Sequence, residues 1–368
     1  MGTTADKLAK LNATKADLKA ALAEKGQTVG DVFSTYPAAV RAISGPAPNG
    51  RAWTQSNITT GGFSDAYYAY GLWVACGQGT GLFYSSDGKT WTQSNITTGI
   101  FVCARNNNGL WLACSLGEGI FSSEDGKTWS KVAGIPSKTY VFSLCCGNDL
   151  WVASMDYGVC YSVDGDIWHD SNCLYKFNAI YYADGSWIGL TDDFGLFYSL
   201  DGKTWTQSDI TNGSFKCAYK ASGFCLVGST GDGLYMSWDN GESWVQNGGI
   251  PTGATVSAIF RGNGLFVAVT DYGPYYSKDG YVWNIGEPSD LMFEDVYYAD
   301  KVWTAPSIYG TGIHYSMDGK TWQQSNISSG QPLFVRHADG MWVAGSGSPL
   351  NNVPQSANGL YYSPTWEP

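Results

Sequence analysis

The sequence predicts an all-β protein, a ring of repeated units that each hold four short antiparallel strands. A text of about 39 residues recurs eight times between residues 54 and 366, and each copy ends on a turn and a tryptophan, most clearly as Ser-Leu-Asp-Gly-Lys-Thr-Trp at 199–205. An apolar run inside each copy, Gly-aromatic-Val-Ala in its clearest form, gives the count of eight independently. A fixed period of this length is typical of repeat architectures.

The elements of one repeat can be assigned from residues 63–95. Residues 63–70 are rich in aromatics and predict the first strand, and the apolar run 72–76 predicts the second. Residues 82–85 predict a third strand, which a two-residue hairpin at Asp87-Gly88 joins to a fourth at 89–95, because this pair tolerates positive φ angles. Four short strands per repeat without helical periodicity predict an eight-bladed β-propeller.

The sequence also predicts how the ring closes. Residues 51–57 repeat the fourth-strand text of 91–96, although no first three strands precede them. We expect this N-terminal strand to complete the last blade, whose other three strands come from 333–363, because a swapped terminal strand removes exposed sheet edges. The alternative uses Pro364-Thr-Trp366 as the closing strand, but its proline cannot donate a ladder hydrogen bond.

The turn before each tryptophan resembles the Asp-box, or BNR repeat, of sialidases and many other propellers. Residues 237–244 have the full-length form, Ser-Trp-Asp-Asn-Gly-Glu-Ser-Trp, and the match covers seven of the eight blades. The resemblance implies that the Asp carboxylate and the Ser hydroxyl bond turn amides while the Trp packs into the apolar layer. We therefore interpret these aspartates as structural.

A sialidase-like glycoside hydrolase is the enzymatic alternative. Sialidases resemble this chain in their Asp-boxes, but they have six blades and an Arg-Ile-Pro signature. They hold the substrate carboxylate with three arginines and also use a Tyr nucleophile beside a Glu, and an acid/base Asp. The predicted propeller holds four arginines and no such signature. Arg105, Arg261 and Arg336 fall on predicted innermost strands of blades two, six and eight, too widely spread to converge easily. We expect no catalytic residues.

Residues 1–43 predict a helical attachment or oligomerisation segment, and the Pro- and Gly-rich residues 44–50 a linker to the propeller at 51–368. Leu8, Leu11, Leu18 and Leu22 form a narrow stripe of two positions in seven, which is typical of a coiled-coil seam. Three heptads are too few to be stable alone. The helix therefore needs copies of itself, as in a trimer, or another protein, unless it packs on its own propeller.

The text of residues 13–37, Ala-Thr-Lys-Ala-Asp-Leu-Lys-Ala-Ala-Leu onward to Tyr36-Pro37, resembles the N-terminal module of tail, fibre and baseplate-associated proteins of bacteriophages and prophages. The resemblance implies that this segment binds other virion or tail proteins. It also implies a location in the virion tail after assembly in the bacterial host cytoplasm.

Composition excludes several partners. The first 45 residues hold six Lys/Arg and four Asp/Glu, so of the net charge of −11 the propeller carries −13, which argues against nucleic acid and anionic membranes. The sequence has no apolar run of 18 residues and no signal peptide, so we expect no membrane insertion. Nine cysteines and three histidines lack metal-ligand spacing, and the cysteines suit small core positions in a chain folded in a reducing cytoplasm. We expect no metal and no cofactor; no motif supports Ca²⁺.

Candidate binding residues lie where the repeat breaks, in the loops between second and third strands. The regular text there changes to an acid followed by an aromatic ring, and an exposed ring beside a carboxylate suits a sugar; the alternative is that the Asp caps a tight turn and the ring packs on its neighbour. The candidates are Asp156, Tyr157, Asp193, Phe194, Asp271, Tyr272 and Tyr309. The last blade adds a long irregular loop at 345–359.

Together these features predict a phage or prophage tail-associated receptor-binding protein whose propeller recognises a host-surface glycan or protein. The alternatives are the sialidase-like hydrolase and a structural decoration or spacer protein of the virion. The predicted receptor loops all lie on the face that also holds the connections between blades.

Overall fold

The computed structural model describes residues 15–16, 19–20, 50–136, 138–221, 224–307, 310–347 and 359–364. The chain divides into two units, Met1–Pro48 and Asn49–Pro368. Of the predicted helical segment 1–43, the four described residues are helical, and its remainder and residues 44–49 of the predicted linker lie outside the described residues. No helix of the described part is long and apolar enough to cross a membrane.

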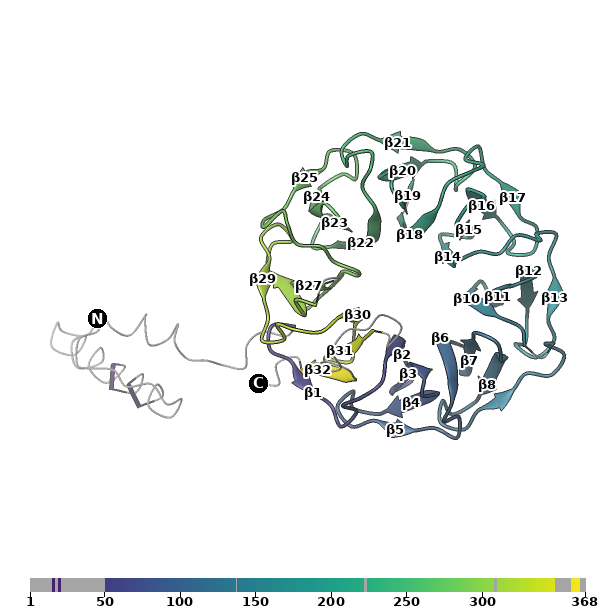
Figure 1. Cartoon of the computed structure of the whole chain (residues 1–368), viewed down its shortest axis with the longest axis horizontal. Coiled ribbons are helices and arrows are strands. Elements are labelled where there is room, and N and C mark those ends of the chain that lie inside the picture. Colours follow the sequence, from purple (N-terminus) through teal and green to yellow (C-terminus); the bar gives the residue numbers. More distant parts are fainter. Residues whose placement is uncertain are drawn as a thin grey trace, which may run out of the picture. The chain divides into compact units, whose positions relative to one another are not determined.

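The described residues of the second unit form antiparallel sheets arranged around a ring, with the first strand of each repeat innermost (Figure 1). From inner to outer strand, the first four groups are β2 (Phe63–Ala69), β3 (Leu72–Gly79), β4 (Leu82–Ser85) and β5 (Thr92–Gln93); β6 (Gly99–Asn107), β7 (Leu110–Ser115), β8 (Gly119–Ser123) and β9 (Ser130–Lys131); β10 (Val141–Gly147), β11 (Leu150–Met155), β12 (Gly158–Ser162) and β13 (His169–Asp170); β14 (Ala179–Ala183), β15 (Ser186–Leu190), β16 (Leu196–Ser199) and β17 (Thr206–Gln207).

The remaining groups continue around the ring and return to its start. They are β18 (Phe215–Ala221), β19 (Phe224–Ser229), β20 (Leu234–Ser237) and β21 (Val245–Asn247); β22 (Val256–Gly262), β23 (Leu265–Thr270), β24 (Gly273–Ser277) and β25 (Asn284–Ile285); β26 (Tyr297–Ala299), β27 (Val302–Pro306), β28 (Ile313–Ser316) and β29 (Gln323–Gln324); β30 (Pro332–Ala338), β31 (Met341–Ser346), β32 (Leu360–Pro364) and β1 (Thr54–Gln55). Six of these groups are separate four-stranded sheets, and β3 pairs with β6 to join the first two groups into one sheet of eight strands.

The apolar second strands hold the ring together. Every residue of β11 and of β23 is buried, and the second-strand tryptophans Trp73, Trp151 and Trp187 are among the largest fully buried side chains. The apolar clusters lie between neighbouring sheets: Leu150 of β11, for example, shares a cluster with Trp187 of β15. Each sheet therefore buries its apolar faces against the next one, so the ring needs all its members.

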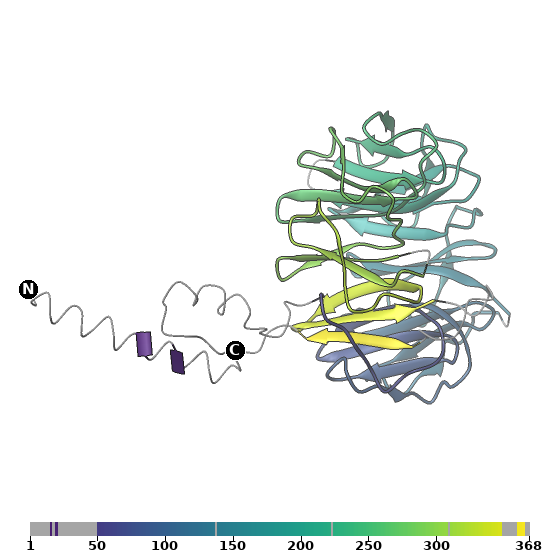
Figure 2. The same ribbon diagram turned by 60° about the vertical axis from the view of Figure 1, so that its left-hand side comes forward.

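The ring closes as the sequence predicts. Thr54 and Gln55 of β1 pair with Tyr362 and Tyr361 of β32, which makes β1 the outer strand of the last sheet, and the two ends of the ring lie side by side in Figure 2. Pro364 belongs to β32, where it pairs with β31, so the alternative closure through residues 364–366 is wrong.

The turn of the last sheet is assembled from both ends of the ring. The Gly50 amide donates to Ser363 Oγ at 3.0 Å, and Trp53 Nε1 donates to the Gly50 carbonyl at 2.9 Å. The Asp-box at 85–91 makes the same two bonds within one chain segment, at 2.9 and 3.1 Å. Trp53 is thus the tryptophan of the last repeat, a place that the sequence analysis gave to Trp366, which lies outside the described residues.

The Asp-box aspartates serve the turns, as the sequence predicts. Asp125 Oδ1 accepts the backbone amides of Thr128 at 2.7 Å and Lys127 at 2.8 Å, and Ser123 Oγ donates to the same oxygen. The amide of Thr128, and after it that of Lys127, lowers the pKa of Asp125 against a smaller opposing effect of burial. Bonds from the Ser hydroxyl and turn amides recur at Asp87, Asp164, Asp201, Asp239, Asp279 and Asp318.

Candidate functional site

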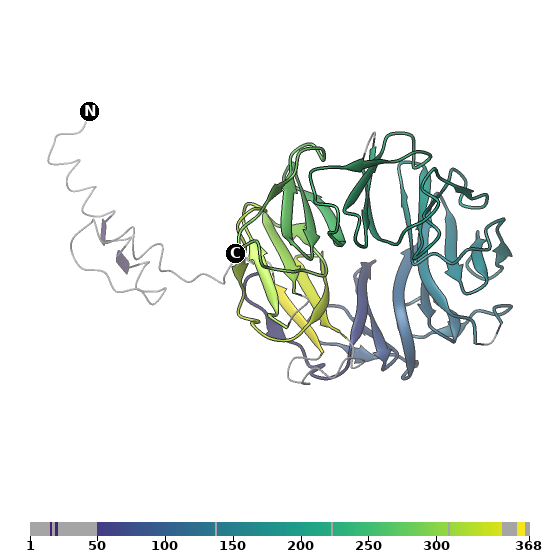
Figure 3. The ribbon, with the colours of Figure 1, turned by 45° about the horizontal axis from the view of Figure 1, so that its top comes forward.

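The ends of the strands define two faces of the ring. One face holds the Asp-box turns and the hairpins between first and second strands. The opposite face, the connection face, holds the loops between second and third strands and the connections that lead into the next innermost strand. All the predicted site residues among the described residues belong to loops of the connection face. The innermost strands face one another around the centre of the ring (Figure 3).

The predicted rings are accessible, as binding requires. Tyr157, Phe194 and Tyr272 are 41%, 50% and 53% exposed. Asp156 and Asp193 are exposed and Asp271 is partly buried. Tyr309 and most of the long loop 345–359 lie outside the described residues.

Phe194 belongs to a cluster of aromatic and charged side chains from the third and fourth sheets. Its ring lies 4.9 Å from that of exposed Tyr175. Lys176 Nζ lies 4.5 Å above the ring of Phe142, which stacks at 6.3 Å on exposed Tyr140. We call this cluster, completed by one carboxylate, the aromatic patch: Tyr140, Phe142, Tyr175, Lys176, Asp192 and Phe194.

The carboxylate of the patch is that of Asp192, whereas the sequence analysis selected its neighbour Asp193. Asp192 Oδ2 lies 3.8 Å from Lys176 Nζ, and Oδ1 accepts hydrogen bonds from Asn178 Nδ2 and, at 3.5 Å, from Ser214 Oγ. Among the described residues, Asp193 makes no ion pair or side-chain hydrogen bond, but it belongs to the same exposed loop.

The hydroxyl of Thr191 caps the turn at 191–195. Thr191 Oγ1 accepts the Phe194 amide at 2.8 Å and donates to the Gly195 carbonyl at 2.9 Å. The alternative is therefore wrong for this loop in its first part, that the aspartate caps the turn, whereas the ring of Phe194 does pack on a neighbour, Tyr175, as its second part expects. The carboxylate of Asp192 is held at the surface, where it can bind a ligand.

The other predicted loops differ in their chemistry. Asp271 Oδ1 accepts the Thr255 amide at 2.7 Å, so this aspartate fixes the connection before β22, while Thr270 Oγ1 accepts the Tyr272 amide in the turn itself. The Asp156 amide donates to the Tyr140 carbonyl at 3.1 Å, which attaches the loop of Asp156 and Tyr157 to the edge of the aromatic patch. Within the described part of the chain, no ring contact, ion pair or side-chain hydrogen bond joins Tyr272 to the patch.

The connection residues of the patch were missed from the sequence. Tyr140, Tyr175 and Lys176 lie between repeats, where the text has no regular position against which a change could be seen. Their composition is a usable signal nonetheless, because two aromatic residues and a lysine stand in segments that the other repeats fill with Ser, Asn and Thr.

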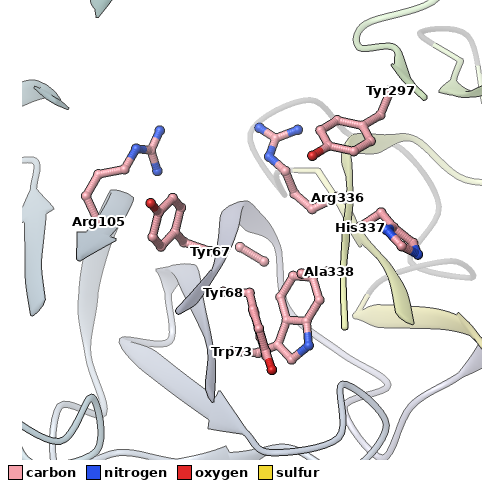
Figure 4. A pocket seen from close by; sticks show the side chains of 9 residues that line it. Tyr67, Tyr68, Trp73, Arg105, Tyr297, Arg336, His337 and Ala338 are labelled. Carbon is pink, nitrogen blue, oxygen red and sulfur yellow. The ribbon is translucent and has the colours of Figure 1, made fainter. Parts of the chain in front are cut away.

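A pocket of about 290 Å³ lies at the centre of the ring, between innermost strands of the first, second and last groups (Figure 4). Arg105 of β6 and Arg336 of β30 face it, and Tyr67, Tyr297 and Trp73 line it (Figure 4). Arg105 and Arg336 occupy the same register position of their innermost strands. This position pairs with the residue that follows the aromatic residue or Cys of the second strand, and we call it the waist position. Its eight residues are Tyr67, Arg105, Cys145, Tyr181, Tyr219, Phe260, Tyr297 and Arg336.

The two waist arginines converge on carboxylates of the protein itself. Buried Asp65 lies 2.6 Å from Arg105 Nη1 and 3.0 Å from Arg336 Nη2, and Asp295 Oδ2 lies 2.5 Å from Arg336 Nη1. Burial opposes the charge of Arg336, but Asp65 and Asp295 more than offset it and raise the pKa of its guanidinium. Arg261 instead lies over the ring of Phe266 at 5.0 Å. Two of the three candidate arginines thus have their charge balanced internally.

A second central cavity, of about 410 Å³, lies toward the connection face. Its lining includes the second residue of several innermost strands. At that residue the pairing with the second strand shifts by one position. Such a β-bulge turns an additional side chain out of the ladder. Four bulge residues and one residue at the matching place line this cavity, which we call the mouth cavity: Ser64, Lys216, Ser257, Leu333 and Glu294.

The mouth residues were also missed, although the repeat contained the signal. Phe63, Phe101, Phe215 and Phe293 stand ten residues after an anchoring tryptophan, and the next residue along varies from Ser to Val, Lys and Glu. When one position keeps its Phe in these repeats and the next position varies, the varying side chain is expected to lie outside the packed core.

Within the described ranges, no three His, Cys, Asp or Glu residues are placed to hold a metal ion. All nine cysteines are free thiols and seven of them are buried, which agrees with their interpretation as small core residues.

Comparisons with known proteins place the fold. No protein-family model matches the chain, and no curated protein matches its sequence. Among solved structures, the computationally designed Ika8 protein matches with a TM-score of 0.67 at 8% identity, over 86% of this chain and 100% of its own. Sqt1 of Saccharomyces cerevisiae gives 0.63 at 8%, over 87% and 100%, and YCF48 of Cyanidioschyzon merolae gives 0.54 at 13%, over 85% and 98%.

These likenesses show the fold alone. The chain is an all-β protein whose four-stranded antiparallel sheets match those of β-propellers.

Proposed function

We propose that the chain is a non-enzymatic receptor-binding protein of a phage or prophage tail, whose propeller recognises a host-surface glycan through the aromatic patch. In this proposal the propeller has eight blades, with the eight-stranded sheet counted as two, and the N-terminal segment attaches it to other tail proteins. The tail assignment rests on the text of residues 13–37.

The observation that carries the proposal is the aromatic patch. Tyr140, Tyr175 and Phe194 are large exposed rings within one small area, and exposed apolar side chains that cluster typically mark a binding surface. Such rings can stack on the apolar face of a sugar. Lys176 and Asp192 lie beside them and offer a donor and an acceptor for sugar hydroxyls.

The patch suits a glycan better than nucleic acid or a membrane. The propeller carries a net charge of −13, which repels phosphate backbones and anionic lipids. Sugar hydroxyls are neutral, so stacking and hydrogen bonding at the patch do not have to overcome that charge.

The binding class can be separated from both alternatives in one assay. The full chain is incubated with sialylated and capsular glycans, and released product and retained glycan are measured together. We expect saturable retention without cleavage. Product release would replace the proposal with the sialidase-like hydrolase, and the absence of both release and retention across these glycans and intact host-range cells would favour the structural spacer.

A further inference from the structure

The mouth cavity carries an inference that goes beyond glycan recognition at the aromatic patch. Ser64 of β2 and Lys216 of β18 line the same cavity from opposite sides of the ring, which places it on the ring axis. Its volume of about 410 Å³ lies within the range of cavities that hold small molecules in proteins. β-bulges are frequent beside such sites because they re-aim one side chain without disturbing the rest of the strand.

Two opposite charges line this cavity without pairing with each other. Lys216 comes from β18, and Glu294 comes from the segment that leads into β26, with the β22 strand between them around the ring. Among the described residues, neither side chain makes an ion pair or a side-chain hydrogen bond with the protein. Burial raises the pKa of Glu294 while Lys216 lowers it in part, so the two charges are within electrostatic reach of each other.

The other two charges on the cavity wall, Arg336 and Asp295, contact each other at 2.5 Å. Arg336 also contacts Asp65, which is not a wall residue and which pairs with Arg105. These four residues cancel in charge. A ligand therefore meets one unpaired ammonium and one unpaired carboxylate, and the cavity as a whole has no net charge that would favour a simple anion or cation.

We infer that the mouth cavity binds a small zwitterion, of about the size of an amino acid, whose acidic group pairs with Lys216 and whose ammonium group pairs with Glu294. Hydrogen-bonded charge pairs of this kind are stronger than neutral hydrogen bonds, and partly buried Glu294 is screened less by solvent than exposed Lys216. Tyr181, Tyr219 and Tyr297 supply the remaining wall, where aromatic faces can pack on the carbon skeleton of the ligand.

The experiment is isothermal titration calorimetry of the full chain with free L-α-amino acids and γ-aminobutyrate, each tested singly. We expect at least one of these probes to bind saturably at one site per chain. Its N-acetyl derivative, which lacks the ammonium, and its amide, which lacks the carboxylate, should each bind at least tenfold more weakly. No saturable heat from any probe would overturn the inference.

Variants test the two named charges. Lys216→Met and Glu294→Gln should each weaken binding of the same probe at least tenfold, with folding checked by thermal melt. Lys278→Met and Glu242→Gln change the same residue types on Asp-box turns and should bind like the parent. Binding that survives both cavity variants would show that the probe is held elsewhere, which also overturns the inference.

This inference and the proposed function fail separately. Lys216→Met and Glu294→Gln should leave glycan retention unchanged, while Phe194→Ala should leave binding of the zwitterion unchanged. A chain that retains glycan but binds no zwitterion would refute only zwitterion binding at the mouth cavity and would leave the proposed function intact.

Discussion

Single side chains show what each place in the repeat demands. His314 of β28 occupies the position that Phe83, Phe121 and Phe197 hold in other third strands, and it lies buried against the ring of Phe293 at 5.4 Å. Burial lowers the pKa of His314 to about 4, from an ordinary value of 6.5. The folded protein therefore keeps a neutral histidine in a place built for an apolar ring.

That histidine makes stability depend on pH in a defined window. The unfolded chain takes up a proton near pH 6.5, while the folded state holds His314 neutral down to about 4, so stability is full above pH 6.5 and falls as the pH drops toward 4. The shift corresponds to about 3 kcal/mol. Chemical denaturation between pH 7 and pH 4 should show this loss, and His314→Phe should remove the larger part of it; burial also lowers the pKa of His337, which contributes to the remainder.

The matched control is exposed His169, whose replacement by Gln should leave the profile of the parent. Asp-box carboxylates such as Asp125 have a lowered pKa, so their contribution is lost only below the ordinary range of aspartate and falls outside the window. An unchanged slope between pH 6.5 and pH 4 in His314→Phe would contradict the burial argument.

Asp65 balances the charges of the two arginines at the centre of the ring. Its side chain is 7% exposed and contacts both Arg105 and Arg336. Removing one partner of a buried ion pair leaves the other charges uncompensated, so Asp65→Asn should lower the free energy of unfolding by about 2–4 kcal/mol. Urea denaturation measures this, and Asp170→Asn, on the exposed outer strand β13, should change it little. Equal stability of both variants would show that the arginines are neutralised by solvent instead.

At the scale of the element, local chemistry explains what could be predicted. The strands expected at 63–70, 72–76 and 82–85 are found at Phe63–Ala69, Leu72–Gly79 and Leu82–Ser85, because turns and apolar runs define them locally. Glycine at 88 is required twice over, since its φ is +68° and an added Cβ would lie 2.7 Å from Met341 Cγ. The turn of the last sheet was predicted through the repeated text of residues 51–57, although its parts come from the two ends of the ring.

The split turn predicts that Trp53, near the N-terminal end of the ring, stabilises the last sheet. Trp53 is buried and donates to the Gly50 carbonyl, so Trp53→Ala should cost about 3–5 kcal/mol of stability, as truncation of a buried aromatic ring usually does. Trp238→Ala, which removes an exposed ring, is the control and should cost little. Thermal melts of both variants test this, and a loss for Trp53→Ala no larger than that for Trp238→Ala would contradict closure by β1.

The candidate site was less predictable than the strands, because its contacts join segments that lie apart in the sequence. The sequence analysis found Phe194 because its loop departs from a regular text, but it chose Asp193 over Asp192, since nothing in the local text tells which carboxylate reaches Lys176 and Asn178. Those contacts join the connection before β14 to the loop after β15 of the same sheet. Lys216 was missed because a bulge, which depends on strand pairing, turns it toward the ring axis, and Glu294 occupies the matching place before β26.

At the scale of the whole molecule, the two faces of the ring have different roles. Asp-box turns repeat the same hydrogen bonds around one face, as in those of Asp87 and Asp125, and their carboxylates are occupied. The connection face carries the aromatic patch and opens toward the mouth cavity, and its residues differ from sheet to sheet. A rigid repeated scaffold with variable loops on one face is a common design for recognition.

The aromatic patch can be tested against an equally exposed pair on the opposite face. Tyr281 lies on an Asp-box turn at the other end of β24 from Tyr272, and its ring stacks on that of exposed Trp238 at 5.6 Å. Dissociation constants for the retained glycan are measured for the full chain, for Tyr175→Ala with Phe194→Ala, and for Trp238→Ala with Tyr281→Ala, at matched oligomeric state because multivalency can mask weak sites. Each stacking ring contributes on the order of 1 kcal/mol, or about fivefold in affinity. We predict a loss of about twentyfold or more for the patch pair and none for the opposite pair; parental affinity in a folded patch variant would contradict recognition through this face.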